Sequence, residues 1–339
     1  MSAFVTDQFR ILNAGSFVES ISNNSYYAFL GLSNPTSVGF GRTTNWDTST
    51  TNNPVDNFQY LSHYRDTCLF GKKITTENAR RVIRKVDWIA NTPYDMYRHD
   101  YRQGNEAPVS KTVRLYDANY YIITSEFKVY ICLDNGSFGV NPTVTGSAIE
   151  PTQTDVEPVT FSDGYRWKYL FSISPSDVIK FDSTEYITVP NDWSTTTDSS
   201  IQTVREGGDS DTNDNQIKTV YIEEGGTAYS NETSLPILGD GSGGEVSITV
   251  DSSGVIIDVV VTNGGKGYTY GVVDLRNKSG SGSKLIPIIP PAKGHGYNIY
   301  EELGTDKVLM YARFDDSTKD FPIDTVFSQV GIIKNPETF

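Results

Sequence analysis

The sequence predicts a mainly β protein with a few helices, and three observations lead to that class. The 339 residues include 21 Tyr, 16 Phe and 29 Gly; aromatic side chains suit pleated strands, and glycine suits the turns between them. Several segments alternate apolar and polar residues with period two. A Gly-Gly-x-x-Tyr stretch also occurs twice, ending at Tyr229 and at Tyr268.

Two helices are expected in the first hundred residues. One is predicted over residues 6–21, where apolar side chains recur at near-helical spacing behind a capping Thr6-Asp7 pair: Phe9, Leu12, Phe17 and Ile21. The other is predicted to begin at Thr76, because apolar residues follow at i, i+3, i+4 and i+7: Ala79, Val82, Ile83 and Val86.

Strands are expected through most of the remaining chain. Alternation or short apolar runs predict them at residues 26–32, 127–133, 165–173, 185–190 and 325–333. In the strand that follows the Asp163-Gly164 turn, Arg166 and Lys168 are expected on the face opposite Trp167. Three polar, turn-rich stretches predict long surface loops: 39–57, 134–162 and 191–215.

The internal repeat predicts a separate β module. Residues 217–230 match residues 256–269 at an offset of 39, and the same offset carries Gly241-Ser-Gly243 onto Gly280-Ser-Gly282. Two copies are too few for a propeller or a solenoid. We therefore expect an inserted β module at 205–295, and a core formed by 1–204 with 296–339.

Charge and hydropathy narrow the possible partners. Twenty-eight Lys and Arg against 42 Asp and Glu give a net charge of −14, and a field of that sign repels phosphates, so neither nucleic acid nor an anionic membrane is expected as a partner. The apolar runs are far shorter than the roughly 20 residues that span a bilayer. Residues 1–7 lack the features of a signal peptide, and Cys68 and Cys132 form no CxxC pair. A protein made in a reducing cytoplasm is expected.

The usual motifs of catalysis and cofactor binding are absent from the sequence. It contains no HExxH, GxSxG, GxxxxGK[ST] or strand-linked GxGxxG pattern. His63, His99 and His295 are scattered, and His99 lies in a polar aromatic stretch typical of a solvated surface. We therefore predict no catalytic residue, no cofactor and no metal ligand.

Two charged stretches are candidate binding sites. Residues 209–215 begin like a calcium loop, but Asp214 and Val220 stand where that loop needs Gly and a bidentate Glu, which favours an acidic linker. One basic cluster comprises Lys72, Lys73, Arg80, Arg81, Arg84 and Lys85. It favours a solvated helix face or a contact with an acidic neighbouring subunit.

Several stretches, in order along the chain, resemble one phage protein family. Asp163-Gly-Tyr-Arg-Trp-Lys-Tyr-Leu-Phe171 and Thr184-Glu-Tyr-Ile-Thr-Val-Pro190 look like the central signature of the baseplate wedge protein encoded by gene eight of T-even-like contractile-tailed phages. Further matches lie at residues 5–10, 40–42, 129–134 and 327–336. Relatives carry a basic pair directly before Asp-Trp, whereas here Val86 separates Arg84-Lys85 from Asp87-Trp88. The repeat has no recognised counterpart in the family.

The resemblance implies a layered β-sandwich with helix-bearing side loops, assembled as a homodimer without catalysis. In the family, that dimer sits in the tail baseplate of the virion and contacts other wedge proteins, the products of genes six, seven and ten. The three polar loops are then the expected contact segments. Two alternatives stay open: a carbohydrate- or receptor-binding module in which Tyr229 and Tyr268 stack on sugars instead of packing the repeat, and a tail-associated glycan hydrolase with paired carboxylates.

Overall fold

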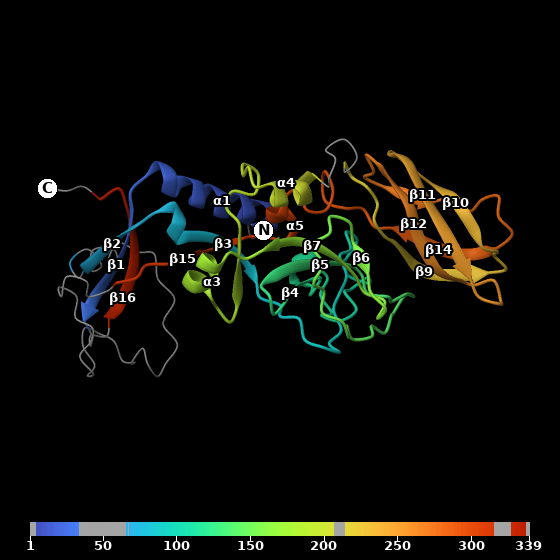
Figure 1. The fold of residues 1–339 in the computed structure, drawn as a ribbon, viewed down its shortest axis with the longest axis horizontal. Helices are drawn as coiled ribbons and strands as arrows, with labels where there is room; N and C mark the ends of the chain where they lie inside the picture. Colours follow the sequence, from blue (N-terminus) through green and yellow to red (C-terminus); the bar gives the residue numbers. More distant parts are fainter. Residues whose placement is uncertain (1–4, 34–65, 67, 207–213, 315–326, 337–339) are drawn as a thin grey trace, which may run out of the picture. The chain divides into compact units, whose positions relative to one another are not determined.

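The computed structural model describes residues 5–33, 66, 68–206, 214–314 and 327–336, and they form a mainly β protein with a few helices. The predicted fold class is confirmed (Figure 1). The chain divides into two compact units, one of Met1–Val82 with Asp306–Phe339 and one of Ile83–Thr305. These boundaries differ from the predicted division at 204/205 and 295/296, which stays a prediction.

The first unit combines one helix with short antiparallel sheets. Helix α1 (Asp7–Asn23) begins where predicted, because the Thr6 hydroxyl accepts from the Phe9 N–H. Strands β1 (Tyr26–Ser33), β2 (Cys68–Ile74) and β16 (Phe327–Lys334) form a sheet in the order β16-β1-β2. The buried core of this unit includes Ile21, Tyr26, Ile74 and Ala79.

The predicted second helix is wrong. Only a single 3-10 turn, η1 (Thr76–Asn78), forms, and residues Ala79–Arg84 are strand β3, which runs across the boundary of the units. Its first half pairs antiparallel with β15 (Lys307–Met310), with Ala79 opposite Met310 and Val82 opposite Lys307. Ala79, Val82 and Ile83 are buried in a strand, so their helical spacing was coincidental. The basic cluster accordingly lies on β2, on β3 and just beyond it, not on a helix.

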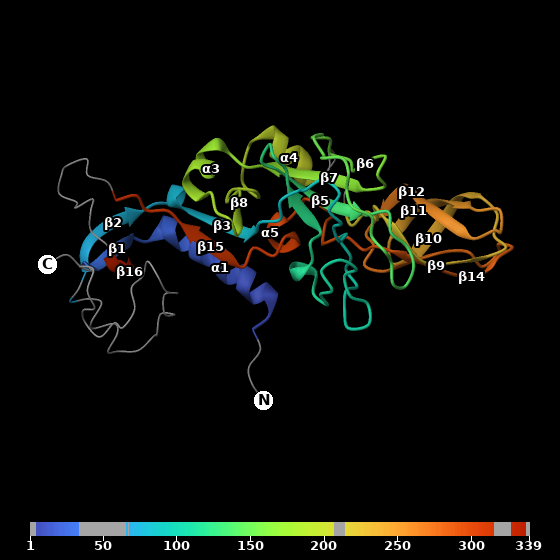
Figure 2. The same ribbon diagram turned by 90° about the horizontal axis from the view of Figure 1, so that it is seen from below.

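The second unit is built around a four-stranded antiparallel sheet. Its strands are β4 (Tyr121–Ile123), β5 (Lys128–Asp134), β6 (Val159–Thr160) and β7 (Arg166–Ser172), in the order β4-β5-β7-β6. Figure 2 shows β5 and β7 side by side. Both central strands are buried on two faces, so Cys132 and Trp167 are each 0% exposed. The same unit contains several short elements: η2 (Leu115–Asp117), α3 (Pro175–Phe181), β8 (Tyr186–Val189), α4 (Ser199–Glu206) and α5 (Ile299–Glu302).

The repeat folds as two interlocked copies, which we call the repeat module (residues 217–289). Copy one supplies β9 (Val220–Thr227), β10 (Glu232–Gly239) and β11 (Ser242–Val250). Copy two supplies β12 (Ile256–Lys266), β13 (Gly271–Val273) and β14 (Ser281–Pro287). The third strand of each copy pairs with the first strand of the other, β11 with β12 and β14 with β9.

The two exchanged ladders have the same register after a shift of 39 residues. Ser242 pairs with Lys266 as Ser281 pairs with Thr227, and a register shift falls at Glu245/Val246 and again at the equivalent Lys284/Leu285. Gly226 and Gly265 occupy equivalent left-handed positions, with φ of 64° and 60°. The module therefore has a pseudo-two-fold axis that relates its halves.

Candidate functional site

The buried histidine of the second unit belongs to a closed polar cluster. The Nδ1 atom of His295 lies 2.6 Å from a Glu302 carboxylate oxygen, whose other oxygen accepts from the Gly296 N–H at 2.7 Å. The Tyr97 ring meets the imidazole edge-on at 4.7 Å between centroids. Such a pair could orient a general base. Side-chain exposures of 3% and 0% leave no room for a substrate, so the cluster positions the chain around α5.

The other two histidines are not brought into this cluster. His63 lies outside the described residues. The Nδ1 atom of His99 accepts from the Ile289 N–H at 3.1 Å, which requires the neutral ring, and desolvation lowers the pKa of His99. His99 is exposed as expected, but its neighbours Tyr97 and Arg98 are buried, so the surrounding stretch is not a solvated surface.

Lys168 contradicts the predicted two-faced pattern of β7. Its side chain was expected on a polar face, yet the residue is 3% exposed and its ammonium donates to the Val156 carbonyl. The face is covered by Val204 of α4 and by Gly296. Burial lowers the pKa of Lys168 to about 8, since the charged form loses its hydration.

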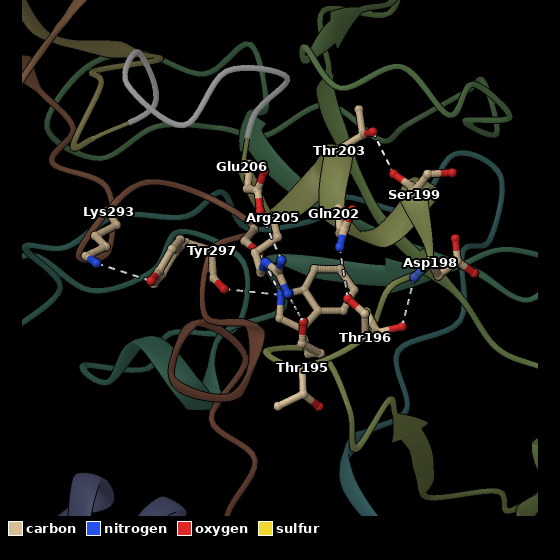
Figure 3. A network of polar contacts seen from close by, with 12 residues as sticks. Thr195, Thr196, Asp198, Ser199, Gln202, Thr203, Arg205, Glu206, Lys293 and Tyr297 are labelled. Atoms are coloured by element: carbon tan, nitrogen blue, oxygen red, sulfur yellow. Dashed lines mark hydrogen bonds and ion pairs between the residues drawn. The ribbon is translucent and has the colours of Figure 1, made fainter.

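The predicted loop at 191–215 is partly a folded polar element. Trp193 is buried; its indole N–H donates to the carbonyl oxygens of Gly296 and Tyr297 at 2.9 and 3.2 Å. Arg205 of α4 returns a hydrogen bond to the Trp193 carbonyl at 2.8 Å. Figure 3 shows this network, with the hydroxyl groups of Thr195, Thr196, Ser199 and Thr203 around it. The segment presents a fixed polar surface that includes the exposed carboxylate of Asp198.

Two side chains fix the predicted loop at 134–162. The buried Asn135 amide donates to the Tyr94 carbonyl at 3.0 Å, and its oxygen accepts from the N–H and hydroxyl of Ser137. Asp163 accepts from the N–H groups of Ala148, Ile149 and Tyr165. Each acceptor satisfies loop N–H groups that no strand can pair, so these parts of the loop are held in place.

The tip of this loop contacts the repeat module. The Gly139 N–H donates to the Ile222 carbonyl at 2.9 Å, and the Tyr221 hydroxyl donates to the Gly139 carbonyl at 2.8 Å. The guanidinium of buried Arg98 lies 4.1 Å from the centre of the Tyr221 ring. We call this contact region, between residues 134–166 and β9, the joint.

Charged groups complete the joint. Arg166 donates to the Lys218 carbonyl at 2.6 Å, and the Lys218 ammonium lies 2.9 Å from Glu157. Burial raises the pKa of Asp134 to about 6, with the carboxylate of Asp258 adding to the rise and Arg166 opposing it. No pattern in the sequence predicts this convergence, because the residues that meet here come from four separate segments.

Two apolar side chains project at the joint. Phe138 and Val140 flank Gly139 and are 63% and 61% exposed. An exposed apolar pair on a backbone that is hydrogen-bonded on both sides is a feature of binding surfaces. The Phe-Gly-Val pattern within a polar loop was the signal available in the sequence.

The repeated tyrosines pack the module. Tyr268 is 0% and Tyr229 9% exposed. The Tyr268 hydroxyl accepts from the Gly244 N–H and donates to the Ile237 carbonyl, while Tyr229 accepts from the Ser283 hydroxyl. A Cβ on Gly241 or Gly280 would lie 2.5 or 2.3 Å from the adjacent ring, so only glycine fits there. Of the two interpretations, packing is therefore the correct one.

The remaining candidates gain no ligand. Residues 209–213 of the acidic stretch lie outside the described residues, while the Asn215 amide donates to the Tyr268 carbonyl at 3.1 Å. Within the described ranges no group of three or more acidic, His or Cys side chains could hold a metal ion. A hollow of about 20 Å³ under α3 has room for one water-sized molecule.

The sequence comparisons assign no family to the chain. No described helix is long and apolar enough to cross a bilayer. No protein-family model matches the sequence, and no curated protein shows significant similarity to it.

Proposed function

We propose that the chain is a non-enzymatic structural subunit of a contractile phage tail, a baseplate wedge protein that assembles as a homodimer and contacts other wedge proteins. The order of the matching stretches along the chain carries the proposal. These include residues 163–171, 184–190 and 327–336. Its location is then the tail baseplate of the virion, after assembly in the host cytoplasm.

The positions of the matching residues support the proposal. Tyr165 and Trp167 stack at 5.5 Å between ring centroids, and both are 0% exposed. Asp163 ties two loop segments together at the start of β7. Residues 163–171 thus contribute to the β4–β7 sheet, and residues 184–190 and 327–336 contain strands β8 and β16. The likeness therefore concerns a shared scaffold and not a surface motif.

The fixed loops support an assembly role. Segments 134–149 and 191–206 are held by buried Asn135 and Trp193. A pre-ordered loop loses less conformational entropy on binding than a mobile one, which favours stable contacts with neighbours. The buried Tyr229 and Tyr268 weaken the sugar-binding alternative, and the enclosed His295–Glu302 pair offers a hydrolase no accessible centre.

The test is the assembly state of the purified full chain. Analytical ultracentrifugation is expected to give a dimer. Adding the products of neighbouring tail genes is expected to give a larger complex, with bovine serum albumin as the negative control. A strictly monomeric protein that ignores those products would refute the proposal.

A further inference from the structure

The two copies of the repeat module differ where β9 meets β12. The Ile217 N–H donates to the Gly264 carbonyl at 3.0 Å, and a Cβ on Gly225 would meet the Ile256 carbonyl at 2.6 Å. These two contacts place β9 antiparallel to β12. Counting four residues inward from either contact puts Tyr221 opposite Val260, its equivalent in the other copy. The pseudo-two-fold axis therefore passes between these two residues.

Equivalent positions on the two sides of this axis have different partners. In copy one, Lys218 pairs with Glu157 and Tyr221 holds Gly139. In copy two, the same positions are Ile257 and Val260, which are 49% and 50% exposed. Lys218 and Tyr221 contact other parts of the chain, whereas their equivalents Ile257 and Val260 are exposed aliphatic residues. This difference indicates that copy two contacts another molecule at these positions.

Copy two and the loop tip border one surface. The Tyr221 hydroxyl donates to the Gly139 carbonyl, and exposed Phe138 and Val140 are the chain neighbours of Gly139. Because Tyr221 also lies opposite Val260, we infer that the loop tip and copy two border the same surface. Asp258, between Ile257 and Val260, is close enough to the loop to help raise the pKa of Asp134. Apolar groups from two segments, joined by a rigid contact, match the anatomy of a small binding hot spot.

The charges at this surface favour a cationic partner. The nearby cations are engaged: Arg98 with Asp100 at 2.7 Å, Lys218 with Glu157, and Arg166 with the Lys218 carbonyl. Asp258 is exposed, and its carboxylate forms no hydrogen bond or ion pair with any residue in the described parts of the chain. A second copy of this acidic chain, with net charge −14, would bring further carboxylates, so a different, basic protein is the better fit.

We propose that Phe138, Val140, Ile257 and Val260 form a docking surface for a segment of another protein, which presents apolar side chains beside a lysine or arginine that pairs with Asp258. The inference rests on the proposed assembly role, because it names the chemistry of one partner. It predicts that binding depends on both the loop and copy two of the repeat module.

A random dodecapeptide display library, panned on the immobilised full-length protein, tests the proposal. Selected peptides are expected to combine Phe, Leu or Ile with Lys or Arg. Their affinity, measured by fluorescence anisotropy, should fall about tenfold or more for Val260→Asp and for Phe138→Ser, since one hot-spot contact is worth at least ~1.4 kcal/mol. Val272, on strand β13 of the same module, is 60% exposed against 50% for Val260, so Val272→Asp is the matched control and should bind as the parent does.

A charge exchange gives the second readout. Asp258→Lys should lower the affinity for the selected peptides. Replacing the Lys or Arg of those peptides with Glu should restore binding to the Asp258→Lys variant but not to the parent protein. Unchanged thermal melting of each variant shows that the fold is retained. Acidic consensus peptides, a failure of the library to yield binders, or equal effects of Val272→Asp and Val260→Asp would each overturn the docking surface. Dimerisation of the chain, tested separately, would be unaffected by that result.

Discussion

The ammonium group of Lys168 shows how a single buried charge can cost stability in this molecule. It lies beneath α4 with the Val156 carbonyl as its hydrogen-bond partner, and its pKa is lowered to about 8. A pKa below the unfolded value of 10.5 means that the folded state binds its proton less tightly. Above pH 10.5 the lysine is neutral in both states and its burial does not lower the free energy of unfolding. As the pH falls through about 8 the buried amine becomes charged, and this part of the free energy of unfolding is lost.

Replacing this lysine should remove that loss. Lys168→Met keeps the length of the side chain without its charge, and we expect the free energy of unfolding at pH 7 to rise by about 2 kcal/mol: about 3 kcal/mol from the pKa difference, less about 1 kcal/mol for the unpaired Val156 carbonyl. Urea unfolding between pH 7 and 10.5 measures it. The gain should shrink toward pH 10.5. A loss of stability in Lys168→Met, or the same gain in the exposed Lys72→Met, would contradict the argument.

At the scale of secondary-structure elements, the repeat module makes a prediction about its two tyrosines. The Tyr268 hydroxyl bonds two buried backbone groups, whereas Tyr229 bonds the half-buried Ser283 hydroxyl. Tyr268→Phe should therefore lower the free energy of unfolding by about 1–3 kcal/mol and Tyr229→Phe by less than about 1 kcal/mol. Tyr270→Phe, at an exposed position, is the control in chemical denaturation. Equal losses for all three variants would disprove the assigned roles.

Most elements with a clear period were predictable from the sequence, whereas strand β3 and helix α3 were not. Helix α1 and strands β1, β5, β7, β8 and β16 lie close to their predicted ranges. Strand β3 was missed because its buried residues do not alternate: Ala79, Val82 and Ile83 are all buried. Helix α3 was missed although its signal was present, with Ser174 as the cap and Pro175 in the first turn.

The site was less predictable than the elements, because it depends on contacts between distant segments. Lys168 looked polar and exposed until α4 and Gly296 covered it. The joint brings Gly139 to Ile222 and Arg166 to Lys218, and no local pattern encodes such pairs. The repeat itself predicted two equivalent turns, but the exchange of strands between the copies required the ladder register.

At the scale of the whole molecule, two compact units predict two unfolding steps. A core cluster lies within each unit, one containing Ile74 and the other Tyr268, so each unit can be followed by its own core residues. Hydrogen exchange followed by mass spectrometry in increasing urea should show α1, β1 and β2 exchanging in a separate step from β5, β7 and β11. Ile74→Ala should move the first step alone and Tyr268→Phe the second. Exchange of all these amides in one step would exclude independent units.

The pairing of β9 with β14 has a consequence for how such a chain could change over time. The first and last strands of the repeat module lie side by side, with Val220 opposite Pro287 and the Ile288 N–H bonded to the Thr219 carbonyl at 2.9 Å. The points where the chain enters and leaves the repeat module are therefore adjacent, like the two ends of a β-hairpin. If the whole repeat module were deleted, a few residues could join the two remaining ends. Such a module can therefore be gained, lost or exchanged during evolution without changing the path of the chain in the rest of the protein.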